Sequence, residues 1–181
     1  KIIDRAKDVG QMKDGTMFAP KYIENKLKFF PYIKEVVAFG NEKVFASALI
    51  CIDIEAVGNW AEKRNLAYSG YTDLSARKEV YDLVQECVQN VNDDLARDEK
   101  LRGSQIKRYL LLHKELDADD GEITRTRKVR RRIISDKYGE LIKALDDPQQ
   151  THREIESEMT FEDGRVGNVK ADLQIREVTV V

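Results

Sequence analysis

The pattern of hydrophobic and polar positions predicts four helices, near residues 20–30, 57–65, 75–96 and 135–145. The clearest is 75–96, where apolar residues recur at helical spacing and therefore fall on one face. Its stripe consists of Val80, Leu83, Val84, Cys87, Val88, Val91 and Leu95. Pro20 suits the first turn of the first helix, and Ser135 is the type of residue that caps the last one.

Segments rich in β-branched and aromatic residues predict a small sheet. Residues 33–39 and 44–54 are separated by Gly40 and Asn41, a pair that favours a turn, so we expect an antiparallel hairpin there. Residues 106–113 are predicted to form a third strand. The expected fold class is therefore α+β, a small three-stranded antiparallel sheet flanked by helices.

Short hairpins are expected at both ends of the chain. Near the N-terminus, two short extended pieces flank residues 5–8. Residues 146–157 are polar and contain a proline, which is typical of a linker. Beyond them, Asp163 and Gly164 are a strong signal for a two-residue hairpin turn. Apolar and polar residues then alternate over 168–175, which indicates a half-buried strand.

The composition is that of a soluble globular protein with a heavily charged surface. Of the 181 residues, 41% are hydrophobic and 35% are charged, and the formal net charge is −2. The chain as a whole therefore exerts no strong attraction on nucleic acid or anionic membranes. No apolar run approaches the roughly 20 residues that span a bilayer, and no signal peptide is recognisable. Because the chain opens at Lys1 inside what reads as a motif, we expect an excised domain.

Cysteine and histidine give no sign of a metal centre or a disulfide. Cys51 and Cys87 lie inside apolar runs and are expected to be small buried hydrophobic residues, which suits a reduced compartment. His113 and His152 have no Cys or carboxylate at ligand spacing. We therefore predict neither a metal site nor a catalytic histidine.

A strongly basic run covers residues 125–132, where six of eight residues are lysine or arginine. Composition alone indicates a solvated surface or an anion-binding patch, and it singles out no member of the run. Two motifs carry more specific information. The first is Asp-Arg-Ala-Lys-Asp at 4–8, which continues to Pro-Lys-Tyr-Ile-Glu at 20–24. The second is Gly-Glu-Ile-Thr-Arg-Thr-Arg-Lys-Val-Arg-Arg-Arg at 121–132.

In this order and spacing, the two motifs resemble those that bracket the small C-terminal domain of AMP-forming acyl-CoA synthetases, most closely the long-chain fatty acid type. The resemblance implies that Lys128 is the catalytic lysine, which would orient the acyl carboxylate and stabilise the α-phosphate during adenylation. Arg5 would contact the nucleotide, and Lys7 would be the hinge about which the domain rotates. Gly15 would lie in the CoA-tunnel loop, where many members of the family carry two glycines and this chain carries one.

The implied reaction gives a physical reason for a lysine. Activation of a carboxylic acid by ATP joins two anions, the carboxylate and the α-phosphate, and builds further charge on a pentavalent phosphorus. A cation directed at that point lowers the barrier by electrostatic stabilisation. A lysine suits this role because it is a flexible point charge that can reach in from a mobile element.

The resemblance thus implies the mobile C-terminal lid of an acid–thiol ligase, a long-chain fatty acid–CoA ligase. Residues 1–8 would be the hinge segment, 9–146 the lid, and 147–181 a linker with a hairpin extension. ATP and Mg²⁺ would bind mainly to a larger N-terminal adenylating domain, with fatty acid and CoA as the other substrates, and the chain alone would be inactive. The expected location is the cytoplasm, with a peripheral position at the inner membrane as an alternative.

Two alternatives remain open. The basic run 125–132 would suit a non-catalytic module that binds nucleic acid or anionic lipid. The net charge of the chain is close to zero, and no aromatic residues lie between the basic ones, which disfavours a binding module of this kind. No nucleic-acid partner is therefore predicted. Within the same superfamily, an adenylating enzyme that loads a carrier protein instead of CoA fits the motifs as well.

Overall fold

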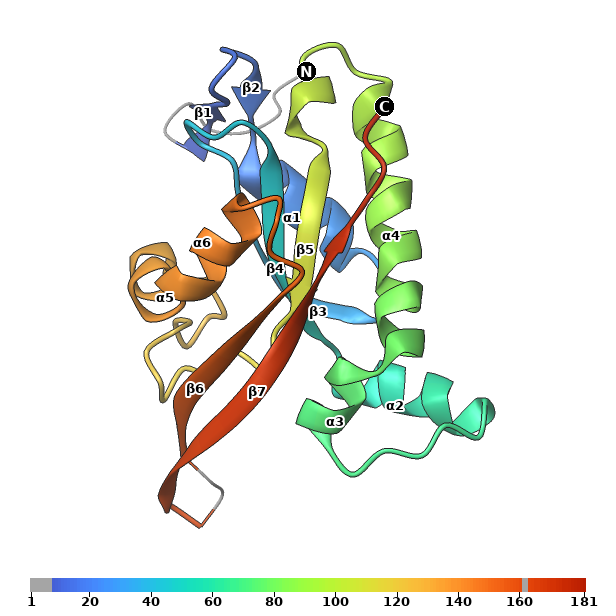
Figure 1. Cartoon of the computed structure of the whole chain (residues 1–181), viewed down its shortest axis with the longest axis vertical. Helices are drawn as coiled ribbons and strands as arrows, with labels where there is room; N and C mark the ends of the chain where they lie inside the picture. The colour runs from blue at the N-terminus through green and yellow to red at the C-terminus, as the bar shows by residue number, and fades with distance from the viewer. Residues whose placement is uncertain (1–7, 161–162) are drawn as a thin grey trace.

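A computed structural model describes residues 8–160 and 163–181 of the chain (Figure 1). Its centre is a five-stranded sheet with the strand order β3-β4-β5-β7-β6. These strands are β3 Ile33–Phe39, β4 Ala46–Ile52, β5 Ile106–Leu111, β6 His152–Thr160 and β7 Val166–Glu177. Two further short strands, β1 Gly10–Gln11 and β2 Met17–Phe18, pair with each other as a small hairpin.

The predicted α+β class is confirmed, but the predicted sheet was wrong in two respects. Strands β4 and β5 are parallel rather than antiparallel, because the chain crosses between them through the long helix α4, Lys78–Ala96. In addition, β7 pairs with β5 and β6 pairs with β7, so the C-terminal hairpin extends the sheet from three strands to five. The β3–β4 hairpin is antiparallel, as its turn residues predicted.

The remaining helices of the described chain are α1 Pro20–Lys28, α2 Ile54–Lys63, α3 Tyr71–Ala76, α5 Arg131–Lys137 and α6 Gly139–Asp146, with a 3₁₀ turn, η2, at Arg102–Ser104. Pro20 begins α1 as predicted. The side chain of Asp53 caps α2 by accepting a hydrogen bond from a backbone N–H at 3.0 Å. Two expectations were wrong. The helix predicted over 75–96 begins only at Lys78, because residues 71–76 form the separate helix α3. The last predicted helix is divided at Tyr138, so that Ser135 lies within α5 and caps nothing.

Both differences have a physical cause. Leu74 is fully buried, so the short helix α3 is stabilised by packing that six residues of sequence do not reveal. Tyr138 has φ −109° and ψ 23°, angles that leave the helical region, and Gly139 after it is unfavourable inside a helix. Helices α5 and α6 therefore meet at a corner instead of continuing as one helix.

The sheet separates two hydrophobic cores. In β4, Ala48 and Ile50 face a core shared with α1 and α4, whereas Leu49 and Cys51 face a core shared with α5 and α6. Most of the apolar stripe predicted for α4 is buried in the first core. Both cysteines are buried and free, as predicted, and burial raises the pKa of the Cys51 thiol to about 12 and that of Cys87 to about 11. No helix in the described ranges is both long and apolar enough to cross a membrane.

The predicted C-terminal hairpin is present, but Thr160 pairs with Val166, so its connection is longer than the two residues expected. Gly164 has φ +83°, a left-handed conformation that favours glycine. Along β7 exposed residues alternate with less exposed ones, and Leu173 and Ile175 are buried, as the alternation predicted. Strand β6 begins at His152, so part of the segment expected to be a linker is a strand of the sheet.

A buried arginine on β5 joins this hairpin to the domain. The Nη1 atom of Arg108 lies 2.9, 2.7 and 2.5 Å from the backbone oxygens of Ala144, Leu145 and Asp147. Its Nη2 donates to the backbone oxygen of Gln150. The guanidinium therefore donates to carbonyl groups at the end of α6 and just beyond it, and holds the start of the approach to β6.

We predict that Arg108→Met lowers the free energy of unfolding by about 3 kcal/mol, because several buried carbonyl groups lose a charged donor. Urea unfolding of the 181-residue chain measures this change. The matched control is Arg97→Met, since Arg97 is exposed and pairs with Asp94 at 3.5 Å, a surface pair expected to contribute less than about 0.5 kcal/mol. Equal stability of the two variants would contradict the role assigned to Arg108.

Candidate active site

Lys128 lies on a tight hairpin between the acidic turn at 117–121 and helix α5. Ile123 and Val129 form an isolated antiparallel bridge, and the backbone N–H of Arg130 donates to the backbone oxygen of Glu122 at 2.9 Å. Nearer the tip, Thr124 and Lys128 are bonded twice. The Thr124 N–H donates to the Lys128 oxygen at 2.8 Å, and the Lys128 N–H donates to Thr124 Oγ1 at 3.0 Å. We call residues 122–130 the lysine hairpin.

The turn of the lysine hairpin is made directly before Lys128. The N–H of Arg127 donates to the Thr124 oxygen at 2.9 Å, and Arg127 itself has φ +63°. A left-handed conformation at a residue other than glycine costs on the order of 1 kcal/mol, so the surrounding hydrogen bonds must offset it. The result is that Lys128 leaves the turn with a bonded backbone and an exposed side chain.

The structure divides the basic run into two groups. Arg131 forms an ion pair with Glu24 of α1, and Arg127 lies 3.8 Å from a carboxylate oxygen of Glu35 on β3. Both carboxylates are buried. The second group has no acidic partner within ion-pair distance in the parts of the chain that the structure describes, and it consists of Arg125, Lys128, Arg130 and Arg132. The ammonium group of Lys128 is therefore free to bind an anionic ligand.

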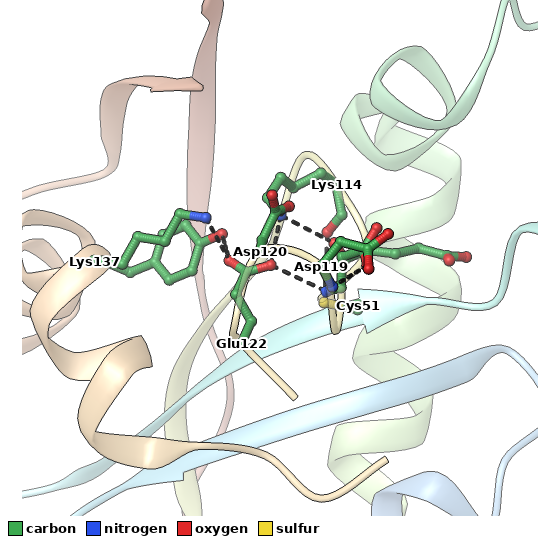
Figure 2. Close-up of polar contacts among 9 residues, drawn as sticks. Cys51, Lys114, Asp119, Asp120, Glu122 and Lys137 are labelled. Atoms are coloured by element: carbon green, nitrogen blue, oxygen red, sulfur yellow. Dashed lines mark hydrogen bonds and ion pairs between the residues drawn. The ribbon is translucent and has the colours of Figure 1, made fainter. Parts of the chain in front are cut away.

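The base of the lysine hairpin rests on a buried carboxylate, shown in Figure 2. Glu122 is 0% exposed, and its Oε1 lies 2.5 Å from Lys114 Nζ. Its Oε2 lies 3.0 Å from Lys137 Nζ and accepts a hydrogen bond from the Tyr138 hydroxyl. The backbone N–H of Asp117 also donates to Oε1, at 3.1 Å. Lysines on two sides of the carboxylate thus connect the segment after β5 with the end of α5 (Figure 2).

These contacts shift the pKa values of the cluster in opposite directions. Burial raises the pKa of Glu122, but the hydrogen bonds from Lys114 and Tyr138 outweigh it, and the pKa of this carboxyl lies below its usual 4.5. Burial lowers the pKa of Lys114, but the bond to Glu122 and a second carboxylate, Asp120 at 3.0 Å, hold it above its usual 10.5. The ionised pair is therefore the stable form at neutral pH.

Gly15 lies in a second feature, the loop between β1 and β2. Its φ is +89°, and its N–H donates to the Met12 oxygen at 3.0 Å. Asp14 Oδ1 accepts hydrogen bonds from the backbone N–H and the hydroxyl of Thr16, at 3.0 and 2.6 Å. The loop borders a hollow of about 1060 Å³, which Gly10, Gly15 and Asn41 help to line. No hydrogen bond or ion pair within the described ranges joins this loop to the lysine hairpin.

The four residues singled out by sequence have different outcomes. Lys128 and Gly15 occupy an exposed hairpin and a glycine-requiring turn, and their roles in catalysis and in the CoA tunnel stay predictions. Arg5 and Lys7 lie outside the described residues, so their roles also stay predictions. Sequence reasoning missed Lys114, whose place after β5 gave no sign that it would face Glu122.

We predict that Glu122→Gln lowers the free energy of unfolding at pH 7 by about 3 kcal/mol, because Lys114 keeps its buried charge and loses its shortest ion pair. The pKa of Glu122 is lowered on folding, so its contribution is complete above its ordinary value of 4.5 and is lost as the pH falls. The difference between wild type and variant should therefore shrink between pH 7 and pH 3 in urea unfolding.

Glu140→Gln is the control for Glu122→Gln, because Glu140 is an exposed carboxylate with surface ion pairs only. Its effect should be small at both pH values. A constant difference between wild type and Glu122→Gln from pH 7 to pH 3 would contradict the ionised state assigned to Glu122.

Comparison with known proteins identifies the domain. A family model described as the AMP-binding enzyme C-terminal domain matches residues 7–150. Among curated relatives, the long-chain-fatty-acid–CoA ligase FadD15 of Mycobacterium tuberculosis is 28% identical over 145 residues, which are 80% of this chain and 23% of that protein. The putative fatty-acid–CoA ligase fadD11 of the same species is 32% identical over 146 residues, 80% of this chain and 24% of that protein.

A human relative is long-chain-fatty-acid–CoA ligase 1, which is 30% identical over 133 residues, 72% of this chain and 18% of that protein. The chain thus spans about a quarter or less of the length of these curated relatives.

Solved structures share the fold. The adenylation domain of a carboxylate reductase from Mycobacterium chelonae aligns with a TM-score of 0.57 and 21% identity, covering 80% of this chain and 20% of that chain. The A-PCP didomain of a carboxylic acid reductase from Segniliparus rugosus, in complex with AMP, aligns with a TM-score of 0.56 and 17% identity, covering 78% and 18%. With the family model matching most of its length, this chain belongs to the family of AMP-binding enzyme C-terminal domains.

Proposed function

We propose that this chain is the mobile C-terminal lid of an AMP-forming long-chain fatty acid–CoA ligase, and that Lys128 is its adenylation lysine. One observation carries the proposal. Of the basic residues in 125–132, Lys128 combines an exposed side chain, which has no acidic partner among the described residues, with a backbone that is bonded in both directions to Thr124. A cation of this kind is held at its base and can extend toward a ligand. The curated relatives, which are named as fatty-acid–CoA ligases, support the substrate class.

The proposed reaction has two steps. The carboxylate oxygen of a fatty acid attacks the α-phosphorus of ATP, an O–P bond forms, and pyrophosphate leaves. The thiol of CoA then attacks the acyl carbon, a C–S bond forms, and AMP leaves. In the first step the ammonium of Lys128 would lie beside the carboxylate and the α-phosphate and stabilise the charge that builds between them.

The rest of the machinery would be divided between this chain and a preceding adenylating domain. Arg5 would contact the nucleotide, Lys7 would be the hinge between the two steps, and the loop of Gly15 would reach the CoA tunnel after rotation. No group of three or more His, Cys, Asp or Glu side chains placed to hold a metal occurs in the described ranges. Mg²⁺ would bind mainly to the adenylating domain, and we derive no step through it.

The two alternatives carry less support. For an enzyme that loads a carrier protein, the likeness to carboxylate reductase structures shows the fold alone. The curated relatives FadD15 and fadD11 are named as fatty-acid–CoA ligases, which favours CoA as the acceptor. Measuring transfer of the acyl group from the same acyl-adenylate to CoA and to a carrier protein would show which of the two is the acceptor. For a nucleic-acid-binding module, the pairing of Arg127 and Arg131 with buried carboxylates removes two of the cations on which such binding would depend.

In the protein that joins this chain to its adenylating domain, we expect Lys128→Ala to lower adenylation at least about 100-fold, because the cation at the reacting phosphate is lost. Exchange of pyrophosphate into ATP with a fatty acid present measures this step. Thioester formation from preformed acyl-adenylate should stay within about threefold of wild type, because the lysine acts in the first step only.

Arg125→Ala is the matched control, since it removes an exposed, unpaired cation from the same run without touching the Thr124–Lys128 bonds. It should leave both steps within about twofold. If Lys128→Ala leaves adenylation intact, or if Arg125→Ala lowers it as strongly, the specific role of Lys128 is wrong.

A further inference from the structure

An ion pair with a buried carboxylate joins the two motifs of this chain. Glu24 is the last residue of the first motif and lies on the buried face of α1, where it is 6% exposed. Its carboxylate accepts a hydrogen bond from Nη2 of Arg131, which belongs to the second motif, 107 residues away. The pair therefore links α1 to the first residue of α5.

A backbone group of β3 completes this contact. Glu24 Oε2 accepts a hydrogen bond from the Ala38 N–H at 2.7 Å, and Arg131 Nη1 lies 3.5 Å from the Ala38 oxygen. The carboxylate and the guanidinium are thus both held against the same residue of β3. This arrangement leaves little freedom for either side chain, because each contacts the backbone of Ala38 as well as the other side chain.

Stability alone gives a weak reason for a charge at this position. Its neighbours on the same face of α1, Ile23 and Leu27, are fully buried and apolar. A charge in such a place often contributes no more than a well-packed apolar residue would, because the buried carboxylate loses its hydration while Arg131 stays 37% exposed. Burial indeed raises the pKa of Glu24, while Arg131 and the Ala38 N–H oppose that rise. A directional role therefore explains the pair better than a general stabilising one.

The position of Arg131 in the chain indicates which segment the Glu24–Arg131 pair orients. It follows Arg130, whose N–H is bonded to Glu122 at the base of the lysine hairpin, and it comes three residues after Lys128. On the N-terminal side of Lys128, Arg127 is half exposed, and its guanidinium lies 3.8 Å from a carboxylate oxygen of Glu35. The Glu24–Arg131 pair is thus the firmer of the two contacts between the hairpin's basic run and the α1–β3 face.

We propose that Glu24 is a positioning residue that acts through Arg131 to hold the lysine hairpin, and with it Lys128, in a set orientation against α1 and β3. The inference rests on the proposed function and extends it: the first motif contributes to adenylation through its last residue. Without the pair, the hairpin would still be anchored at Glu122 but would pivot about that base. A displacement of about 1 Å at a reacting group lowers a rate by up to about 100-fold.

The test uses the protein that joins this chain to its adenylating domain, with the variants Glu24→Gln, Lys128→Ala and the double variant. Glutamine keeps the size of the side chain and an oxygen that accepts from the Ala38 N–H, but it removes the charge. We expect Glu24→Gln to lower pyrophosphate exchange roughly tenfold and to leave thioester formation from acyl-adenylate within about twofold. In the Lys128→Ala background the same substitution should have no further effect, because Glu24 acts through Lys128.

Asp94→Asn is the control for Glu24→Gln. It breaks another ion pair of α1, between Lys26 and Asp94 at 3.4 Å, which does not involve the hairpin, and it should leave adenylation within about twofold. Arg131→Gln should reproduce the effect of Glu24→Gln, and the Glu24→Gln and Arg131→Gln double variant should be no worse than either alone.

The outcomes separate this inference from the proposed function. If Lys128→Ala lowers adenylation and Glu24→Gln does not, the positioning role is wrong and the proposed function stands. The positioning role is also wrong if Glu24→Gln lowers both steps alike, or lowers exchange further when Lys128 is already alanine, since either result indicates a general disturbance. If Lys128→Ala has no effect, the proposed function fails and the inference fails with it.

Discussion

An ionised carboxylate that is out of reach of water must be surrounded by donors, and Glu122 meets this condition only because three segments converge on it. Lys114 comes from the segment after β5, the Asp117 N–H from the acidic turn, and Lys137 and Tyr138 from the corner between α5 and α6. A partly assembled cluster would leave a buried charge uncompensated, which costs several kcal/mol. The buried charge is therefore compensated only when all three segments are in place, and they meet at the start of the lysine hairpin.

The placement of charge along the basic run follows from the same requirement. Six cations within eight residues repel one another if all of them are left unpaired. Two of them, Arg127 and Arg131, turn toward Glu35 and Glu24 on the α1–β3 face. These pairs lower the repulsion and also attach the run to the domain on the two sides of Lys128. Within residues 8–160 and 163–181, acidic partners are thus supplied to Arg127 and Arg131 and not to Lys128.

The sequence predicted those parts of the fold that depend on local pattern. The stripe of α4, Pro20 at the start of α1, the β3–β4 hairpin and the Asp163-Gly164 turn each depend on spacing or on residues adjacent in the chain. The pairing of β7 with β5 does not, because an alternating strand is compatible with any open sheet edge. The parallel pairing of β4 and β5 was missed for a related reason, since the sequence of a strand does not indicate which strand pairs with it or in which direction.

For the candidate site, the sequence singled out Lys128 and gave no sign of the residues that surround its hairpin. Lys128 was distinguished from the other basic residues only by its place in a motif, whereas its structural setting depends on contacts with distant residues. Glu24 and Arg131 are 107 residues apart, and Lys114 and Glu122 face each other across a turn whose shape is not evident in advance. Complementary charges at such separations are too common in a chain with 31 basic and 33 acidic residues to be paired by inspection.

A hairpin with an exposed tip cannot be held in place by a hydrophobic core of its own. In the lysine hairpin only Ile123 is a buried apolar residue, and residues 124–128 are exposed. Apolar burial is also non-directional, so it would keep the hairpin near the domain without setting its orientation. Ion pairs and hydrogen bonds to buried carboxylates are directional, and three of them, from Glu122, Glu24 and Glu35, hold the base and both flanks. An exposed cation such as Lys128 is therefore oriented by contacts between its hairpin and buried carboxylates. For this reason the residues that determine its position, Glu122, Glu24 and Glu35, are buried although Lys128 itself is exposed.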